Sequence, residues 1–541
     1  MTDSKKPVRV DQVAWAQLFP WLAIFKTFRM AIRPSKLAVA LVMLILLFVL
    51  GHGLDVIWGP QAIPGEVSAF GRMSQSDFKA WKKDQIGSRD GRLQEILRSA
   101  YLADLNTQVI EKVLSKPNKY MLSRALVGEH FDKLYDSVQG KAVAQIQSGA
   151  DQSQVSERLA ENLKRVAQKR RNALNKLTEL EPMGIFRATF EFKVNAFDQL
   201  VQSAIGFRFG FSHILDRSQK SSDTVVGALR EMLYTLPSWL YGTYPGFLSL
   251  LSVCMLLIVS FFGGILARLA AVDAAGSAHT PVMASIRFVL RRYLWFVLTP
   301  LMPVIMISVL GLLLMLGGLV FFNLPGLDIL GGFLFFVALL LGFGITILLV
   351  FTMATYPMFY PALVMEGTDS FDVVSRCFGY LVARPWHWFF YTMLSLVYGA
   401  VGYLFFGGLI YLTLSITHQL VGMGVFAQMV DEGSRWNAIM PTPRLGQLLY
   451  SFNWVAGLGF TGKVTAGMIW VWSFFLVSLI GAYTGSFFYC ANTVIYQLLR
   501  QSSEQTSPDE IAIDPIEIEE PQAPSSQQTP DKVDEQSADS Q

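Results

Sequence analysis

The polar residues of this chain that could do chemistry are concentrated in EGTDSFDVVSRCFGYLVARPWHWFFY, residues 366 to 391. Acids, hydroxyls and arginines alternate there with apolar residues, as in an acid–base site or in an amphipathic helix at a membrane surface. In the second interpretation, Ser370 caps a helix, Asp372 suits its positive start and Pro385 ends it. The tryptophans that follow then mark the headgroup level of a membrane. Anchoring alone does not explain the acidic EGTDSFD stretch.

A second candidate is a pair of ionisable residues near the end of an apolar run. His52 and Asp55 stand one helical turn apart, so they share a helix face and would bind a proton or a cation. Together with Asn492 of the last apolar run, they form a candidate polar site. The alternative is a pair at a helix end, exposed at the membrane interface.

Motifs of soluble enzymes are absent from the sequence, which has no GxSxG, HExxH or P-loop pattern. The three cysteines, Cys254, Cys377 and Cys490, form no CxxC pair and have no histidine at zinc-site spacing, so we interpret them as buried thiols. We therefore expect no enzyme activity, no catalytic or metal-binding residue and no cofactor.

The elements that must position these residues are apolar helices long enough to cross a membrane. Of the 541 residues, 52% are hydrophobic and only 16% are charged, unlike an ordinary soluble protein. A bilayer core about 30 Å thick needs roughly 20 apolar residues in a helix. We predict an all-α integral membrane protein with six transmembrane helices, a helical extracytoplasmic domain and a disordered C-terminal tail. The six apolar runs are residues 37 to 58, 246 to 267, 294 to 322, 329 to 363, 388 to 416 and 468 to 496.

Lysine and arginine residues near the ends of these runs predict the orientation. They gather in segments 1 to 36, 268 to 293 and 366 to 387, whereas the turn NLPGLD has none. Because positively charged loops stay in the cytoplasm, both termini are predicted inside a bacterial cytoplasmic membrane, and 417 to 467 become an outer loop. The net charge of +3 is small and scattered, which argues against nucleic acid as a partner.

In this orientation, residues 59 to 182 lie outside the cytoplasm. Two helical stripes, 93 to 113 and 155 to 180, predict a helical hairpin there. The Phe-rich segment 183 to 245 suits the outer membrane interface. The tail, 501 to 541, has no aromatic residue and is rich in acids, serine and proline, so it is predicted to be disordered.

Basic amphipathic segments lead into three of the six runs, and they predict contacts with anionic lipid headgroups. Simple interfacial anchoring is the alternative. In the last run, Gly481 and Gly485 have the small-xxx-small spacing of closely packed helices. The candidate lipid contacts are Lys26, Arg29, Arg33, Arg287, Arg291, Arg292, Arg376 and Arg384.

The combination of EGTDSFD, SRCFGY and ARPW, with the Phe-rich segment before the second run, resembles uncharacterised multi-span bacterial membrane proteins. That resemblance implies six spans and a bacterial source, and it brings no activity or catalytic residue. We expect a non-enzymatic scaffold or envelope-organising component whose partners are the lipid bilayer, anionic lipids and an unknown protein. Two alternatives stay open: a transporter or transporter subunit with a path through the last four runs, and a sensor whose outer domain binds a ligand.

Overall fold

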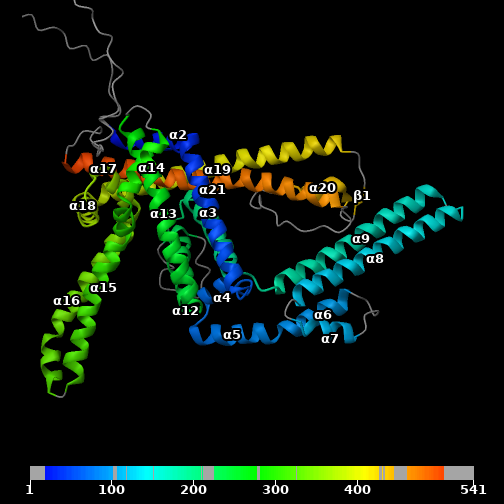
Figure 1. Ribbon diagram of the computed structural model, residues 1–541, viewed down its shortest axis with the longest axis horizontal. Coiled ribbons are helices and arrows are strands. Elements are labelled where there is room, and N and C mark those ends of the chain that lie inside the picture. Colours follow the sequence, from blue (N-terminus) through cyan, green and yellow to red (C-terminus); the bar gives the residue numbers. More distant parts are fainter. Residues whose placement is uncertain are drawn as a thin grey trace, which may run out of the picture.

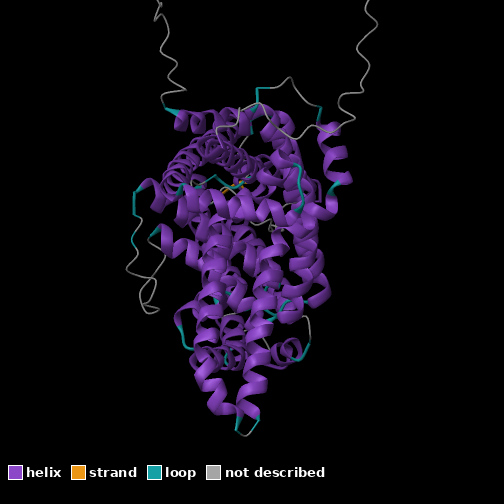
Figure 2. Cartoon of the chain, turned by 90° about the vertical axis from the view of Figure 1, so that its left-hand side faces the viewer, coloured by secondary structure: helices purple, strands orange, loops and turns teal. Residues whose placement is uncertain are grey.

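The protein is described by a computed structural model at residues 19–100, 107–116, 119–149, 151–208, 210, 224–276, 281–324, 326–425, 429–430, 433–443 and 460–504. Within these ranges the helices are accompanied by one antiparallel strand pair, β1 (Met429–Val430) and β2 (Gly433–Ser434) (Figures 1 and 2). The predicted all-α fold class is confirmed. The predicted disorder of the tail falls outside the described residues, except for 501 to 504, which are helical.

Six helices have the length and composition to cross a membrane, and they coincide with the six predicted runs. They extend beyond the apolar residues, so that 268 to 274, predicted as a loop, belong to the second of them. A helix, once nucleated, gains a hydrogen bond with every added residue, so hydropathy does not mark where it stops. The six are α3 (Pro34–Trp58), α13 (Pro245–Ala274), α15 (Tyr293–Asn323), α16 (Leu327–Thr355) continued by a 3-10 turn (Tyr356–Met358) and α17 (Phe359–Glu366), α19 (Pro385–Gly424), and α21 (Phe460–Glu504).

These helices form three pairs that diverge from one packed region, which we call the junction (Figure 1). The pairs are α3 with α13, α15 with α16, and α19 with α21. The largest apolar core of the described residues lies in the junction and includes Leu363, Cys377 and Tyr496. The junction consists of the 3-10 helix η1 (Pro20–Phe25), α2 (Lys26–Ala31), α14 (Val282–Arg291), α17, α18 (Ser370–Ala383) and the C-terminal half of α21.

Contacts at the helix ends show that α3 and α13 run antiparallel, with one pair of ends at the junction and the other pair away from it. The first turn of α3 meets the last turn of α13, where Lys36 Nζ lies 2.5 Å from Asp273 Oδ2. Their other ends meet at Trp58 and Phe247, whose ring centroids are 5.6 Å apart. The described ends of the chain, in η1 and at the end of α21, therefore lie on the same side of the helix set (Figure 1).

The α15–α16 hairpin projects away from the junction and from the other helices (Figure 1). In the most apolar 18-residue window of each of these helices, 0% of the residues are buried inside the protein, compared with 39% for α13. Exposed apolar surface on this scale is costly in water. Only a lipid environment or another membrane protein can cover it.

Glycines allow α21 to approach both α3 and α19. Gly481 and Gly485 face α3: a Cβ atom built on Gly481 would lie 3.0 Å from Leu44 Cδ1, and one on Gly485 would lie 3.7 Å from Met43 Cε. On the other side of α21, a Cβ on Gly402 of α19 would overlap the Tyr483 hydroxyl. Of these three glycines, Gly402 thus has the closest neighbour, and it does not belong to the predicted small-xxx-small pair.

Gly402→Ala is expected to lower the free energy of unfolding by about 1–3 kcal/mol, because the added methyl displaces the buried Tyr483 ring. Gly485→Ala is the matched control, since its methyl makes an ordinary contact and alanine favours a helix over glycine by about 1 kcal/mol. Thermal unfolding in detergent measures both. A Gly485→Ala variant as unstable as Gly402→Ala would contradict this packing.

Six helices, α4 to α9, follow α3 in the chain. They include a hairpin that differs from the predicted one in the segments that it joins. The long hairpin consists of α8 and α9, and the first predicted stripe packs against its side through Leu93 and Leu97, which share a core with Phe131 and Leu177. The sequence does not predict α8, because its apolar residues do not form a single stripe. The six are α4 (Glu66–Arg72), α5 (Gln75–Gly87), α6 (Arg89–Ala100), α7 (Thr107–Leu114), α8 (Lys119–Gln147) and α9 (Gln152–Leu180).

The Phe-rich segment is helical where it is described. Its longest helix, α10 (Ile185–Ile205), bridges the far end of α3 and the middle of α19. At the first end, the carboxylate of Asp55 accepts the backbone N–H of Phe186 at 2.7 Å. At the second, the Tyr403 hydroxyl donates to Asp198 Oδ1 at 2.9 Å. After α10, the described part of this segment continues with α11 (Val225–Arg230), a π-helical turn (Glu231–Thr235) and α12 (Leu236–Thr243).

Candidate functional site: a charged network at the junction

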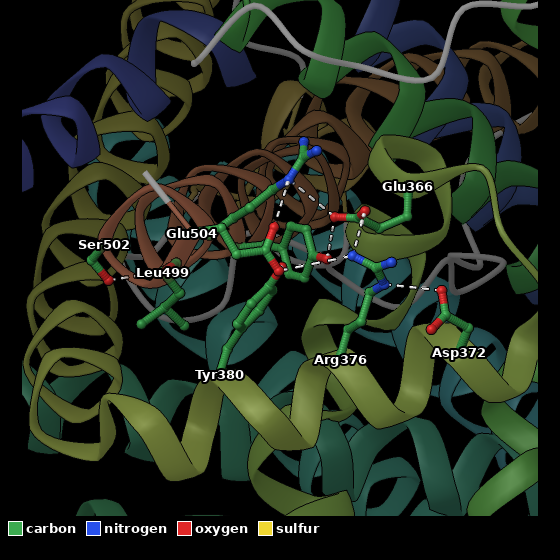
Figure 3. A network of polar contacts seen from close by, with 9 residues as sticks. Glu366, Asp372, Arg376, Tyr380, Leu499, Ser502 and Glu504 are labelled. Atoms are coloured by element: carbon green, nitrogen blue, oxygen red, sulfur yellow. Dashed lines mark hydrogen bonds and ion pairs between the residues drawn. The ribbon is translucent and has the colours of Figure 1, made fainter. Parts of the chain in front are cut away.

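Glu366, the first residue of EGTDSFD, is the centre of a charged network in the junction (Figure 3). Its side chain is only 6% exposed. Tyr496 Oη donates to its carboxylate at 2.8 Å, Arg500 Nε lies 3.2 Å away and Arg376 Nη1 lies 3.3 Å away. One carboxylate thereby connects α17 with α18 and with α21.

The residues after Glu366 position α18 against α15. Gly367 adopts a left-handed conformation (φ 66°) that ends α17, and its carbonyl accepts Arg292 Nη1 at 2.5 Å. The predicted N-cap is wrong by one residue: Asp369 is the N-cap, and Ser370 is the first helical residue. The Ser370 hydroxyl instead donates to the carbonyl of Trp295 at 3.1 Å. A serine predicted to cap its own helix therefore connects two helices.

The outer part of the network connects α18 with the last turn of α21 (Figure 3). Arg376 Nε donates to Asp372 Oδ2 at 2.9 Å, one turn earlier on the same helix. Tyr380 Oη donates to Glu504 Oε1 at 2.6 Å, and Arg376 Nη1 lies 3.8 Å from the same oxygen. Three carboxylates and two guanidinium groups thus alternate across the contact between α18 and α21.

The arrangement of this network suits holding helices together rather than catalysing a reaction. The hydrogen bond to Asp372 raises the pKa of Arg376, and burial raises the pKa of Tyr380, so both groups keep their protons at neutral pH. The carboxylate of Glu366 lies between two guanidinium groups and is engaged in ion pairs with both. Among the residues that the structure describes, no three His, Cys, Asp or Glu side chains are grouped to hold a metal ion.

Several of the eight candidate lipid contacts have partners within the protein. Arg33 pairs with Asp273, and Arg384 Nη2 donates to the carbonyl of Ser502 at 3.1 Å. Arg292 and Arg376 make the contacts described above. Lys26, Arg29, Arg287 and Arg291 are exposed on α2 and α14, and Arg291 also interacts within the protein.

The structure does not bring the candidate polar site together. The two carboxylate oxygens of Asp55 accept the backbone N–H groups of Phe186 and Arg187, so Asp55 caps α10. The Asn492 side chain donates to the carbonyl of Phe488 on its own helix. Lys36 contacts Cys490, two residues before Asn492, and His52 is 16 residues further along α3, about 24 Å at 1.5 Å per residue.

Tyr496, Arg500 and Glu504 are the members of the network that the sequence does not single out as site residues. Arg500 and Glu504 are one turn apart at the end of an apolar helix, a spacing that favours an ion pair, and Arg500 Nε lies 4.0 Å from Glu504 Oε2. That spacing is the one feature of the sequence that points to these two residues. Nothing local connects either residue with EGTDSFD.

Cys377 is expected to resist alkylation in the folded protein. Its side chain is fully buried on α18, and burial, with the nearby charge of Glu366, raises the pKa of the thiol. At pH 8 we expect it to react with maleimide about 100-fold more slowly than an exposed cysteine, since only locally opened molecules expose it. An introduced cysteine at the exposed Val382 is the control on the same helix. Equal labelling rates, read by mass spectrometry, would argue against this burial.

No protein family, curated protein or solved structure matches this chain. The resemblance carried by EGTDSFD therefore stays a prediction. The six long apolar helices and the all-helical fold are those of a multi-span helical membrane protein.

Proposed function

We propose that this chain is a non-enzymatic scaffold of a bacterial cytoplasmic membrane, with both termini in the cytoplasm and α4 to α9 on the outer face. The observation that carries the proposal is the Glu366 network. Its charged groups are engaged with one another, and they fix α17, α18 and α21 together at the point from which the helix pairs diverge. Such a rigid base, from which helix pairs diverge, suits a protein that holds others in place.

The orientation is supported by the basic residues of the junction. Lys26, Arg29, Arg287 and Arg291 are all exposed there, on the side where the described chain ends lie. Each basic side chain near an anionic leaflet contributes about 1 kcal/mol of attraction. Anionic lipids of the inner leaflet are therefore proposed partners of α2 and α14.

A transport path would require polar groups of the spans to face a common space. Tyr360 Oη instead lies 3.0 Å from Ser260 Oγ on α13, in the core. Thr484 donates to the carbonyl of Ile480, and Asn492 also bonds to a carbonyl of its own helix. These contacts favour the scaffold over the transporter.

Two measurements test the proposal. Topology reporters fused after Gln152 and after Gln541 should report the outer and the cytoplasmic side, respectively, and a cytoplasmic Gln152 would overturn the orientation. Cross-linking in native membranes should then capture a defined set of envelope proteins. Deleting residues 119 to 180, which removes α8 and α9 as a unit, should abolish those cross-links. Solute-specific flux in proteoliposomes containing the intact protein would contradict a scaffold.

A further inference from the structure

A pocket of about 460 Å³ opens at the junction beside the end of α21. Its walls are mainly aromatic and include Trp21 of η1 and Phe390 and Tyr391 of α19. Gln501 and Ser502, in the last turn of α21, form part of its lining. The pocket is therefore next to the point where the remaining 37 residues of the chain, 505 to 541, begin.

Basic residues lie beside this pocket, and the nearby carboxylate of Glu504 is already paired with Arg376 and Arg500. Arg384, at the start of α19, is exposed and donates to the carbonyl of Ser502, which lines the pocket. Lys26 and Arg29 are exposed on α2, which follows η1 directly. An apolar pocket with basic residues around it fits a ligand that combines apolar side chains with negative charges.

We propose that residues 509 to 520 of the same chain, DEIAIDPIEIEE, dock in this pocket. The segment has four isoleucines among six acidic residues, so it matches both the aromatic walls and the basic surroundings. Ile511 is seven residues after Glu504, a reach of up to about 25 Å for an extended chain. A tether of this length gives an effective concentration on the order of millimolar, so even weak contacts hold the segment in place.

The N-terminal segment, residues 1 to 18, also adjoins the pocket at Phe19. It contains Lys5, Lys6 and Arg9 with only two acids, Asp3 and Asp11, so the basic surroundings repel it. Charge therefore selects the C-terminal segment as the occupant.

Hydrogen exchange of the full chain in phosphatidylcholine nanodiscs tests the proposal. Backbone amides at 20–25 and 387–391 should exchange about 10-fold faster in a variant lacking 505 to 541, since docking adds to the free energy of local opening. Deletion of 521 to 541 alone is the matched control and should leave exchange unchanged. Serine at the four isoleucines, 511, 513, 516 and 518, should reproduce the full deletion without shortening the chain.

A photo-cross-linker at Ile516 gives a second readout and should label the peptides that contain Trp21 or Phe390 within one chain. Unchanged exchange after deletion of 505 to 541 would overturn the proposal. So would protection that is lost on deletion of 1 to 18 instead, or that requires anionic lipid in the nanodisc. Cross-links formed only between isotopically distinct copies would overturn docking within one chain.

Discussion

Replacing Glu366 with alanine is expected to lower the free energy of unfolding by about 3–5 kcal/mol, because it removes the nearest carboxylate of the mostly buried Arg500 and the acceptor of the Tyr496 hydroxyl. The Arg500 side chain is 13% exposed and approaches Glu366 at 3.2 Å, and Arg376 approaches it at 3.3 Å. The Tyr496 hydroxyl also loses its acceptor. Unfolding in mixed detergent micelles, followed by circular dichroism, measures the change.

Glu366→Gln separates charge from shape, since the amide oxygen still accepts from Tyr496 while the ion pairs are lost. It should fall between the wild type and Glu366→Ala. Glu161→Ala is the control: the Glu161–Arg165 pair is of similar length, 2.7 Å, but its side chains are 64% and 69% exposed. Exposed pairs contribute only about 0.2–1 kcal/mol. If Glu366→Ala shifted stability no more than Glu161→Ala, the network would not be holding these helices together.

Glu66→Ala is expected to have an effect of similar size, about 3–5 kcal/mol, in the region outside the junction. The Glu66 side chain is 0% exposed. Its carboxylate accepts Lys82 Nζ at 2.6 Å, the backbone N–H of Ile63 at 2.9 Å and Trp239 Nε1 at 3.3 Å. Alanine would leave an ammonium group and two N–H donors without this acceptor and would separate α4 from α5 and α12.

The helices that lose protection from hydrogen exchange should differ between the Glu66 and Glu366 variants. Hydrogen exchange should accelerate in α4, α5 and α12 of the Glu66 variant, whereas the junction keeps its protection because it does not contact Glu66. Glu129→Ala is the control, since its pair with Lys133 spans 2.8 Å with side chains 63% and 75% exposed. Faster exchange in α17 and α18 of the Glu66→Ala variant would show that the two regions are not independent.

The sequence predicts the spans well because hydropathy is a local and additive property. The apolar run at 294 to 322 becomes α15 with one extra residue at each end. The same reasoning is less successful between α3 and α13, where the two predicted stripes share a core but the prediction omits α8, which has no clear apolar stripe and pairs with α9. The predicted helix that begins near Ser370 and ends before Pro385 is confirmed as α18, but the prediction omits the contacts that account for the acids of EGTDSFD.

Six membrane-length helices, an all-α fold and the clustering of basic residues near alternate helix ends follow from the order of residues alone. The partners of Glu366 become visible only in the folded protein, since Tyr496 lies 130 residues further along the chain. It also places Asp55 at the start of α10 and gives several of the candidate lipid-binding residues partners within the protein. The physical reason is that apolar burial depends on runs of neighbouring residues, whereas a buried charge is stabilised by a few groups that helix packing brings together from distant parts of the chain.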